Sequence, residues 1–200
     1  METIDSLEAL RDLYDAAVPG SLTKVCNQLT PLYRRWIEAA RFTVLSTVGP
    51  AGTDASPRGD EGPVAHIADG KTLWLPDWRG NNRLDSLENI VLDGRVSLMF
   101  MVPGSNNVVR VNGGAVLTAE SAITAHFEKN GKRPRTVIVI TVGEVYFQCA
   151  KALMRSRLWQ TEPQPGSVPT AGEFLREKDQ AFDAVSYDEG YADYAKERMW

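Results

Sequence analysis

Between Phe42 and Phe147 the chain alternates short β-rich runs with turn residues, and this pattern restricts the possible folds more than any other feature of the sequence. Turn signals occur at Gly49-Pro50-Ala51-Gly52, at Asp69-Gly70 and at 103–107. Helical spacing predicts one helix at 82–92 and a shorter one around 120–129. About six antiparallel strands with these two helices inserted predict a mainly β (α+β) fold built on a small, closed, six-stranded barrel.

The two ends of the chain read as helical additions to this barrel. Residues 1–40 predict two helices that cover it, the first ended by Pro19-Gly20 and the second capped by Ser21 and interrupted by Pro31. Residues 41–159 form the barrel. Residues 160–200 begin with a Pro-rich linker and continue as two short exposed helices, which we expect to pack on the barrel as an extension.

Composition excludes several classes of function. The net charge of −4 provides no broad basic field for nucleic acid, so any anion site must be local. No apolar run approaches the roughly 20 residues that cross a bilayer, and the N-terminus lacks the features of a leader peptide, so we expect a cytoplasmic protein without membrane association. Cys26 and Cys149 are too few and too far apart for a disulfide framework or a zinc site and predict two reduced, buried thiols.

A local anion site is predicted where the inserted helix begins. Asn82 is interpreted as the helix N-cap, with Asp85 three residues on as a variant capping box, which places Arg83 in the first turn. Free backbone N–H groups and the helix dipole disfavour a cation there unless an anion binds between them. The alternative is an Arg83 that points into solvent or pairs with Asp85 or Glu88. A second arginine, Arg79, precedes the same loop and favours the site.

A second cluster of basic residues follows the last strand. Spacing of four residues places Lys151, Arg155 and Trp159 on nearly one face of a predicted helix, where a planar anion or an acidic partner surface would satisfy them. A solvated basic helix end explains these residues equally well. Arg58, on a polar strand, is a third candidate, although it could pair with the carboxylates of Asp60 and Glu61.

Motifs of direct catalysis are absent from the sequence. The sequence contains neither the phosphate-binding loop of the nucleotide hydrolases nor the motifs G-x-G-x-x-G, H-E-x-x-H and G-x-S-x-G. His66 and His126 lie 60 residues apart and have no evident Ser or Cys partner. Any reaction is therefore expected to be carried by a cofactor.

The order of elements resembles the pyridoxamine 5'-phosphate oxidase-like group of FMN-binding split-barrel proteins over roughly residues 35–160. The segments that carry the resemblance are Arg41 to Thr47, Ala55-Ser56-Pro57-Arg58-Gly59, Leu73 to Asp77, Asn82-Arg83, Arg95 to Phe100, Arg110-Val111-Asn112-Gly113 and Glu144 to Phe147. The resemblance implies a homodimeric six-stranded antiparallel barrel with FMN in a cleft shared by two subunits.

The same resemblance implies the cofactor-binding residues. Arg58, Asn82 and Arg83 would hold the FMN phosphate. Pro76, Asp77 and Asn112 are assigned to the flavin site, Asn112 near the N5 and carbonyl edge of the ring. The segment after the last strand would approach the flavin from the partner chain, with Lys151, Arg155 and Trp159 as its candidates.

The chain differs from the true oxidase, and these differences indicate that it belongs to an uncharacterised branch of the group. The chain ends without the Arg-x-His pair of that enzyme, and the Ser-Arg-Lys phosphate clamp is replaced by Asn82-Arg83-Leu84. The first hypothesis is an FMN-dependent oxidoreductase that acts on an unknown small molecule. The alternatives are a flavin-binding store or sensor without turnover, and a relative that binds F420 or haem. Catalytic residues are not assigned, and no metal is expected.

Overall fold

A single antiparallel sheet of seven strands organises the protein. The computed structural model describes residues 1–160 and 168–199. The strands are β1 (Phe42–Gly49), β2 (Gly52–Gly59), β3 (His66–Ile67), β4 (Thr72–Asp77), β5 (Arg95–Met101), β6 (Val108–Thr118) and β7 (Thr136–Gln148). Their order in the sheet is β2-β1-β5-β6-β7-β4-β3, and every neighbouring pair is antiparallel.

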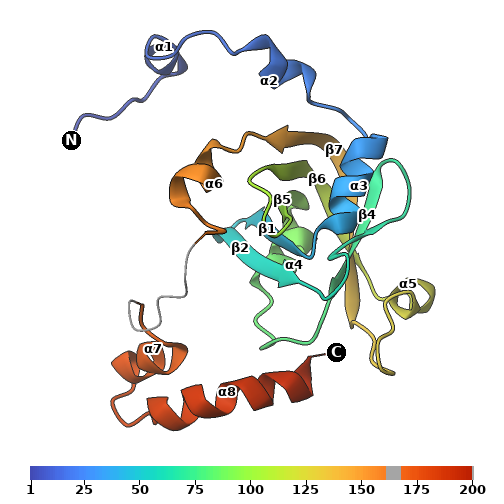
Figure 1. The fold of residues 1–200 in the computed structure, drawn as a ribbon, viewed down its shortest axis with the longest axis vertical. Coiled ribbons are helices and arrows are strands. Elements are labelled where there is room, and N and C mark those ends of the chain that lie inside the picture. Colours follow the sequence, from blue (N-terminus) through green and yellow to red (C-terminus); the bar gives the residue numbers. More distant parts are fainter. Residues whose placement is uncertain (161–167, 200) are drawn as a thin grey trace.

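Eight helices in the described part of the chain flank this sheet (Figure 1). They are α1 (Leu7–Arg11), α2 (Pro19–Thr23), α3 (Pro31–Ala39), α4 (Asp85–Leu92), α5 (Ser121–Ala125), α6 (Lys151–Ser156), α7 (Ala171–Lys178) and α8 (Ala184–Arg198). The predicted positions of the two inserted helices are confirmed, since α4 lies between β4 and β5 and α5 lies between β6 and β7.

The prediction of a closed six-stranded barrel is wrong: the sheet has seven strands and stays open between β2 and β3. These two edge strands are consecutive in the sequence, and the connection of six residues between them (60–65) spans at most about 20 Å. The sheet must therefore curl until its edges approach each other. It does not close, because β3 contributes only His66 and Ile67 to pairing and both of these pair with β4.

Every second side chain along the strands points inward, and these side chains form the core. In β1 every second residue from Thr43 to Thr47 is buried, and β5 follows the same rule with Val96, Leu98 and Phe100. The fully buried Ile37 of α3 joins this core. Pro31, which was expected to interrupt a longer helix, is instead the first residue of α3, and the Thr30 hydroxyl accepts a hydrogen bond from the backbone N–H of Tyr33.

Tight turns join the strands where the sequence predicted them. Pro50 and Ala51 form the two-residue connection between β1 and β2. The Asp69-Gly70 signal lies in the β3–β4 hairpin, in which His66 pairs with Trp74 and Ile67 with Leu73. The strand predicted at 136–147 is confirmed as β7.

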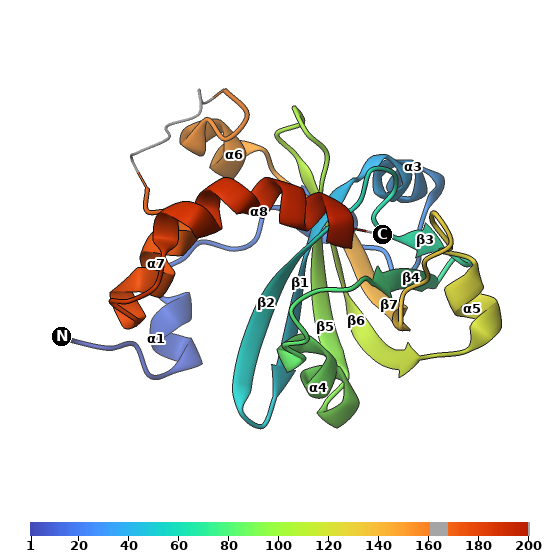
Figure 2. The same cartoon turned by 90° about the horizontal axis from the view of Figure 1, so that it is seen from below.

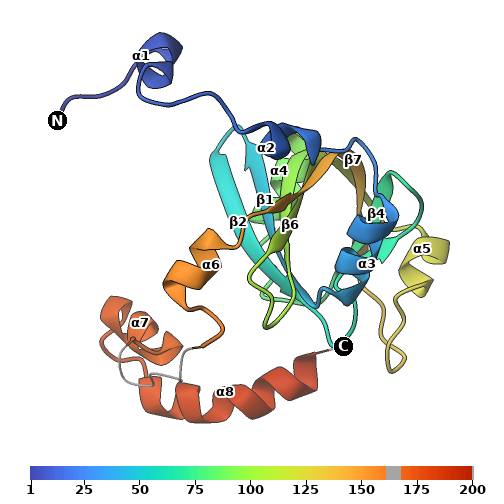
Figure 3. The same cartoon turned by 45° about the horizontal axis from the view of Figure 1, so that its top comes forward.

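The first two helices stand apart from the sheet (Figures 1 and 3). Neither α1 nor α2 buries a residue, so of the N-terminal helices α3 alone contributes a buried side chain. Ser21 is not the cap of α2, because Pro19 occupies its first turn and Val18 is the N-cap. The expectation of two buried thiols is wrong for Cys149, which is exposed, while Cys26 is half-buried and both are free.

The C-terminal part forms a helical hairpin. The Pro-rich linker predicted after residue 160 falls mainly outside the described residues. Gly172 of α7 packs so closely on Ala184 that a Cβ at Gly172 would lie 2.5 Å from the Ala184 carbonyl oxygen. In the described ranges, no helix has the length and apolar character needed to span a membrane.

Candidate functional site

A cleft of about 1150 Å³ opens where β2 and β4 approach each other. Its walls come from the end of β2, the end of β4, the loop 78–84, the first residues of β7 and one face of α8. Small-molecule pockets commonly measure about 300–1000 Å³, so this cleft is large enough for a cofactor. Figure 2, seen from the side of α8, shows this helix running across the sheet toward the end that carries β4.

The cleft is positively charged although the chain is acidic. The lining residues that the structure describes include five arginines and three carboxylates, an excess of two positive charges, whereas the whole chain carries −4. The arginines are Arg58, Arg79, Arg83, Arg135 and Arg198. The requirement that an anion site be local is therefore met at this cleft.

Arg58 is half-buried, whereas the other four arginines are exposed. Its side chain is 18% exposed and forms an ion pair with Asp77, which is 19% exposed. Pairing with Asp77 differs from the alternative drawn from the sequence, in which Arg58 pairs with Asp60 or Glu61. Asp60 pairs instead with Lys129. Arg58 reaches Asp77 because the curled sheet brings the end of β2 to the end of β4.

Two buried polar atoms at this cleft have no hydrogen-bond partner among the described residues. They are Nε of Arg58 and the hydroxyl oxygen of Thr136, and both residues line the cleft. Buried polar atoms are nearly always paired in native proteins. The two atoms fit a site that is completed by a polar ligand, and the surrounding arginines select an anionic one.

The loop before α4 has a different conformation from the one predicted. Helix α4 begins at Asp85 with Leu84 as its N-cap, so the assignment of Asn82 as N-cap with a capping box to Asp85 is wrong. The Asn81 side chain accepts a hydrogen bond from the backbone N–H of Arg83 at 2.9 Å, and Asn82 adopts a left-handed conformation with φ of 59°. This Asx turn delays the start of the helix by two residues, from Arg83 to Asp85.

Arg83 consequently precedes the helix instead of lying in its first turn. Its side chain is 78% exposed and forms an ion pair with Asp85, which was the alternative drawn from the sequence. Both Asn82 and Arg83 nevertheless line the cleft. An exposed ion pair is weak, so a phosphate could recruit the Arg83 guanidinium at little cost.

The structure brings five of the predicted site residues together and separates four. Arg58, Pro76, Asp77, Asn82 and Arg83 all line the cleft. Asn112 lies elsewhere, on β6, where its amide group donates to Glu144 at 2.6 Å and accepts from Ser97 at 2.6 Å. Lys151, Arg155 and Trp159 also lie outside the cleft lining within one chain.

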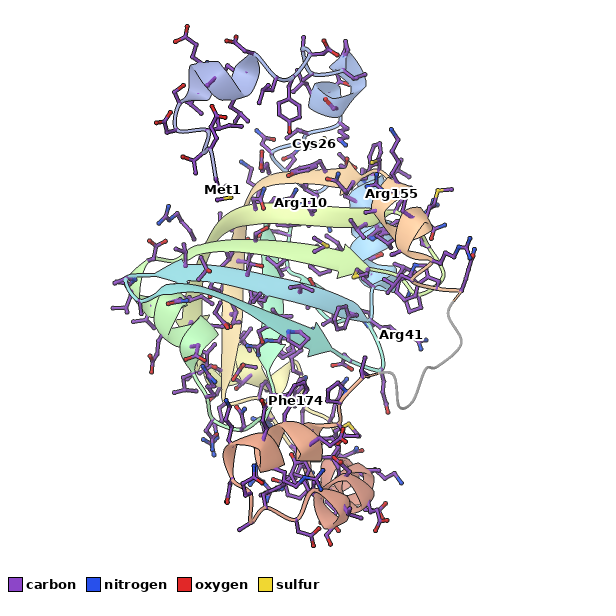
Figure 4. All side chains as sticks on the ribbon, turned by 90° about the vertical axis from the view of Figure 1, so that its left-hand side faces the viewer. Met1, Cys26, Arg41, Arg110, Arg155 and Phe174 are labelled. Atoms are coloured by element: carbon purple, nitrogen blue, oxygen red, sulfur yellow. The ribbon has the colours of Figure 1, made fainter. Side chains whose placement is uncertain are left out.

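The expectation that Lys151, Arg155 and Trp159 share a helix face holds only for the first two residues. Helix α6 ends at Ser156, and Arg157 is left-handed with φ of 51°. Trp159 therefore lies beyond the helix, where its indole N–H donates to the carbonyl of Ser105 at 2.7 Å. Figure 4 shows Arg155 on α6, well separated from the α7 helix that carries Phe174.

Several cleft residues were not predicted. Arg135 and Thr136, at the start of β7, carry no local motif that separates them from any strand start. Tyr187, Tyr191 and Tyr194 of α8 follow a spacing of four and three residues, which marks one helix face. That spacing was available in the sequence, but the position of the face against the cleft was not.

These features define a β protein with an open, curled antiparallel sheet and an arginine-lined cleft at its split. A sequence model for pyridoxamine 5'-phosphate oxidase matches residues 29–149, more than half of the chain. The chain belongs to the pyridoxamine 5'-phosphate oxidase-like family. No curated protein matches it.

Solved structures share parts of the fold at low identity. HupZ of Group A Streptococcus is 20% identical, with a TM-score of 0.48, and the match covers 58% of this chain and 91% of HupZ. An FMN-binding protein of Syntrophomonas wolfei is 15% identical, with a TM-score of 0.44, over 72% of this chain and 97% of that protein. An F420 reductase is 16% identical, with a TM-score of 0.42, over 60% of this chain and 98% of that protein. The family assignment rests on the sequence match alone.

Proposed function

We propose that the protein binds FMN in the arginine-lined cleft and acts as an FMN-dependent oxidoreductase on a small molecule. The observation that carries this proposal is the gathering of Arg58, Arg79 and Arg83 with two unpartnered buried polar atoms in one cleft of a chain of this family. Charge-assisted hydrogen bonds from arginine are well suited to a phosphate dianion.

Each arginine has a distinct part in this proposal. Asp77 orients the Arg58 guanidinium and leaves its Nε available for the phosphate. Arg83 exchanges its exposed contact with Asp85 for the phosphate. The described residues provide no ion-pair partner for Arg79, which therefore adds uncompensated positive charge at the mouth of the cleft.

The cofactor supplies the redox chemistry when it is bound. Among the described residues that line the cleft, no histidine or cysteine occurs, and Asp60 and Asp77 are both engaged in ion pairs. In this proposal the chain itself binds the phosphate, orients the cofactor and excludes water from the cleft.

The proposal includes a homodimer in which each chain completes the partner's site. Lys151 and Arg155 are exposed and lie away from the cleft of their own chain, which agrees with a role toward a partner. Trp159 is fixed by its bond to Ser105 and could close a partner's cleft by stacking. Closed twofold symmetry would give two equivalent sites.

Titration of the purified protein with FMN and with riboflavin tests the cofactor. We expect near-stoichiometric binding of FMN and much weaker binding of riboflavin, which lacks the phosphate. Tight binding of F420 or haem without FMN binding would overturn the proposal. Turnover is tested separately, by reducing bound FMN with NADH or NADPH and following its reoxidation by oxygen or by candidate substrates. A flavin that resists both steps would favour a storage or sensing role.

A further inference from the structure

The C-terminal helix α8 carries a continuous aromatic face. Tyr187, Tyr191, Tyr194 and Arg198 follow one another at intervals of four, three and four residues, so they share one side of the helix. Neighbouring tyrosine rings have centroids 5.9 and 6.4 Å apart, and the Arg198 guanidinium lies 4.2 Å from the Tyr194 ring centroid. These distances are those of interacting aromatic rings and of a cation over a ring.

This face is turned toward the cleft and yet is not covered. All four residues line the same cleft as Arg58 and Arg83. Tyr187 is 36% exposed, and Tyr191 and Tyr194 are each 51% exposed. A row of rings that faces a charged cleft without packing against its opposite wall leaves room for a planar group between them.

Helix α8 is held at its start by α7 and at its end by Lys132, which lies between α5 and β7. At its start, Asp188 accepts a hydrogen bond from the backbone N–H of Gly172 at 2.9 Å, and Ala184 is buried against α7. At its end, the Lys132 ammonium donates to the carbonyl oxygens of Glu197 at 3.4 Å and Met199 at 3.1 Å. The helix thereby keeps its place along one side of the sheet (Figures 2 and 3), where its residues line the cleft.

We propose that the tyrosine face of α8 is the outer wall of the flavin site and stacks on the planar ring of the cofactor bound in the cleft. This inference rests on the proposed function. The arginines hold the phosphate at one side of the cleft, and the tyrosines offer the electron-rich aromatic surface that a flat, electron-poor ring prefers. Residues 184–198 lie outside the segment matched by the family model, so this wall does not follow from the family assignment.

Paired substitutions in the full-length protein test the wall. In the double variant Tyr191→Ala/Tyr194→Ala, loss of two stacking rings should weaken FMN binding about tenfold. Because a phenol stacked on a flavin quenches its fluorescence, emission of the bound FMN should also rise. The variant Tyr191→Phe/Tyr194→Phe retains both rings and should keep most of the affinity. Tyr14→Ala removes a tyrosine that is 73% exposed and does not line the cleft, and it should behave as wild type.

A second variant tests the wall without changing the tyrosines, in case the double alanine variant disturbs the structure of α8. Lys132→Ala leaves every tyrosine in place and removes the attachment at the end of the helix. It should raise the fluorescence of bound FMN and weaken binding by a smaller factor than the double alanine variant. Thermal unfolding of each variant should match wild type before its binding is compared.

The outcomes separate the two proposals. Unchanged FMN affinity and unchanged fluorescence in both the tyrosine and Lys132 variants would overturn the wall while leaving FMN binding intact. A wild-type protein that binds no FMN would overturn both. An aromatic face that instead holds a second protein would appear as a change of mass in the tyrosine variants with no change in flavin fluorescence, which also contradicts the wall.

Discussion

Arg58 of β2 and Asp77 of β4 form an ion pair across the split between strands that stand first and sixth in the sheet order. Neither strand pairs with the other through the backbone. The pair therefore links the two sides of the open sheet and places a buried guanidinium at the cleft. The same ion pair is therefore part of both the fold and the candidate site.

A double-mutant cycle on this pair should reveal strong coupling. Both side chains are less than one-fifth exposed, so Arg58→Met or Asp77→Asn leaves a mostly buried partner without its counterion. Each single variant should lower the free energy of unfolding by roughly 3 kcal/mol. The double variant should lose clearly less than the sum. Additive losses in denaturant titrations would show that the pair contributes little to the joining of β2 and β4.

Arg83→Ala should weaken FMN binding about tenfold to a hundredfold while leaving riboflavin binding and apo stability nearly unchanged. The variant Arg83→Lys should retain only part of the FMN affinity, because lysine lacks the forked geometry of the guanidinium. Arg95 is a matched control: its side chain is 73% exposed and pairs with Asp93, much as the 78% exposed Arg83 pairs with Asp85. Arg95 does not line the cleft. Equal effects of the two substitutions in calorimetric titrations would remove Arg83 from the phosphate site.

The proposed dimer predicts a mass of about twice the 22.1 kDa of one chain in light scattering with FMN bound. Arg155→Ala should then weaken FMN binding although Arg155 is outside the cleft of its own chain. Arg176 of α7 is likewise exposed and provides a control substitution. A monomer saturated with FMN would contradict the shared site.

The free energy of unfolding should decrease at acid pH because of His66, which contacts His126. Their ring nitrogens lie 3.1 Å apart. Burial and, to a smaller extent, the charge of His126 lower the pKa of His66 below its ordinary value of 6.5. Near and below that value the unfolded chain binds more protons at this position than the folded protein does. The contribution of neutral His66 to the free energy of unfolding is therefore complete above about pH 6.5 and is lost as the pH falls toward the pKa of His66 in the folded protein.

The check is to compare the free energy of unfolding of wild type and His66→Gln from about pH 5 to about pH 7.5. The substitution should flatten the rise of stability with pH in this window. An identical slope in the two proteins would show that His66 does not titrate differently in the folded and unfolded states.

Gly113→Ala should destabilise the sheet by about 1–3 kcal/mol. The register of β6 against β7 shifts between Asn112 and Gly113, and a Cβ at Gly113 would lie 2.0 Å from the Thr141 carbonyl oxygen. Backbone on both sides prevents relief of this contact. Gly62→Ala is the control, since a Cβ at Gly62 would meet nothing within 4 Å and the backbone there is not left-handed. Chemical denaturation that gives equal midpoints for the two variants would contradict this account of the bulge.

The sequence by itself determined the elements and their order. Alternation along 42–48 and 136–147, and the turn residues Pro50-Ala51 and Asp69-Gly70, correctly predicted antiparallel strands and hairpins, because both depend on local side-chain chemistry. The resemblance to the family named nine residues of a flavin site, and the structure shows where they lie relative to one another. Arg58, Pro76, Asp77, Asn82 and Arg83 do line one cleft.

Only the tertiary structure decided how these elements meet. Whether the sheet closes depends on the edges of β2 and β3, which share no ladder, and local patterns carry no information on that contact. The start of α4 was misplaced because the Asn81 side chain competes for the backbone of Arg83 and delays the helix to Asp85. The tyrosine face of α8 could be recognised in the sequence as a helix face, but its position at the cleft depends on a contact between the end of the helix and Lys132, 65 residues before Glu197 in the chain.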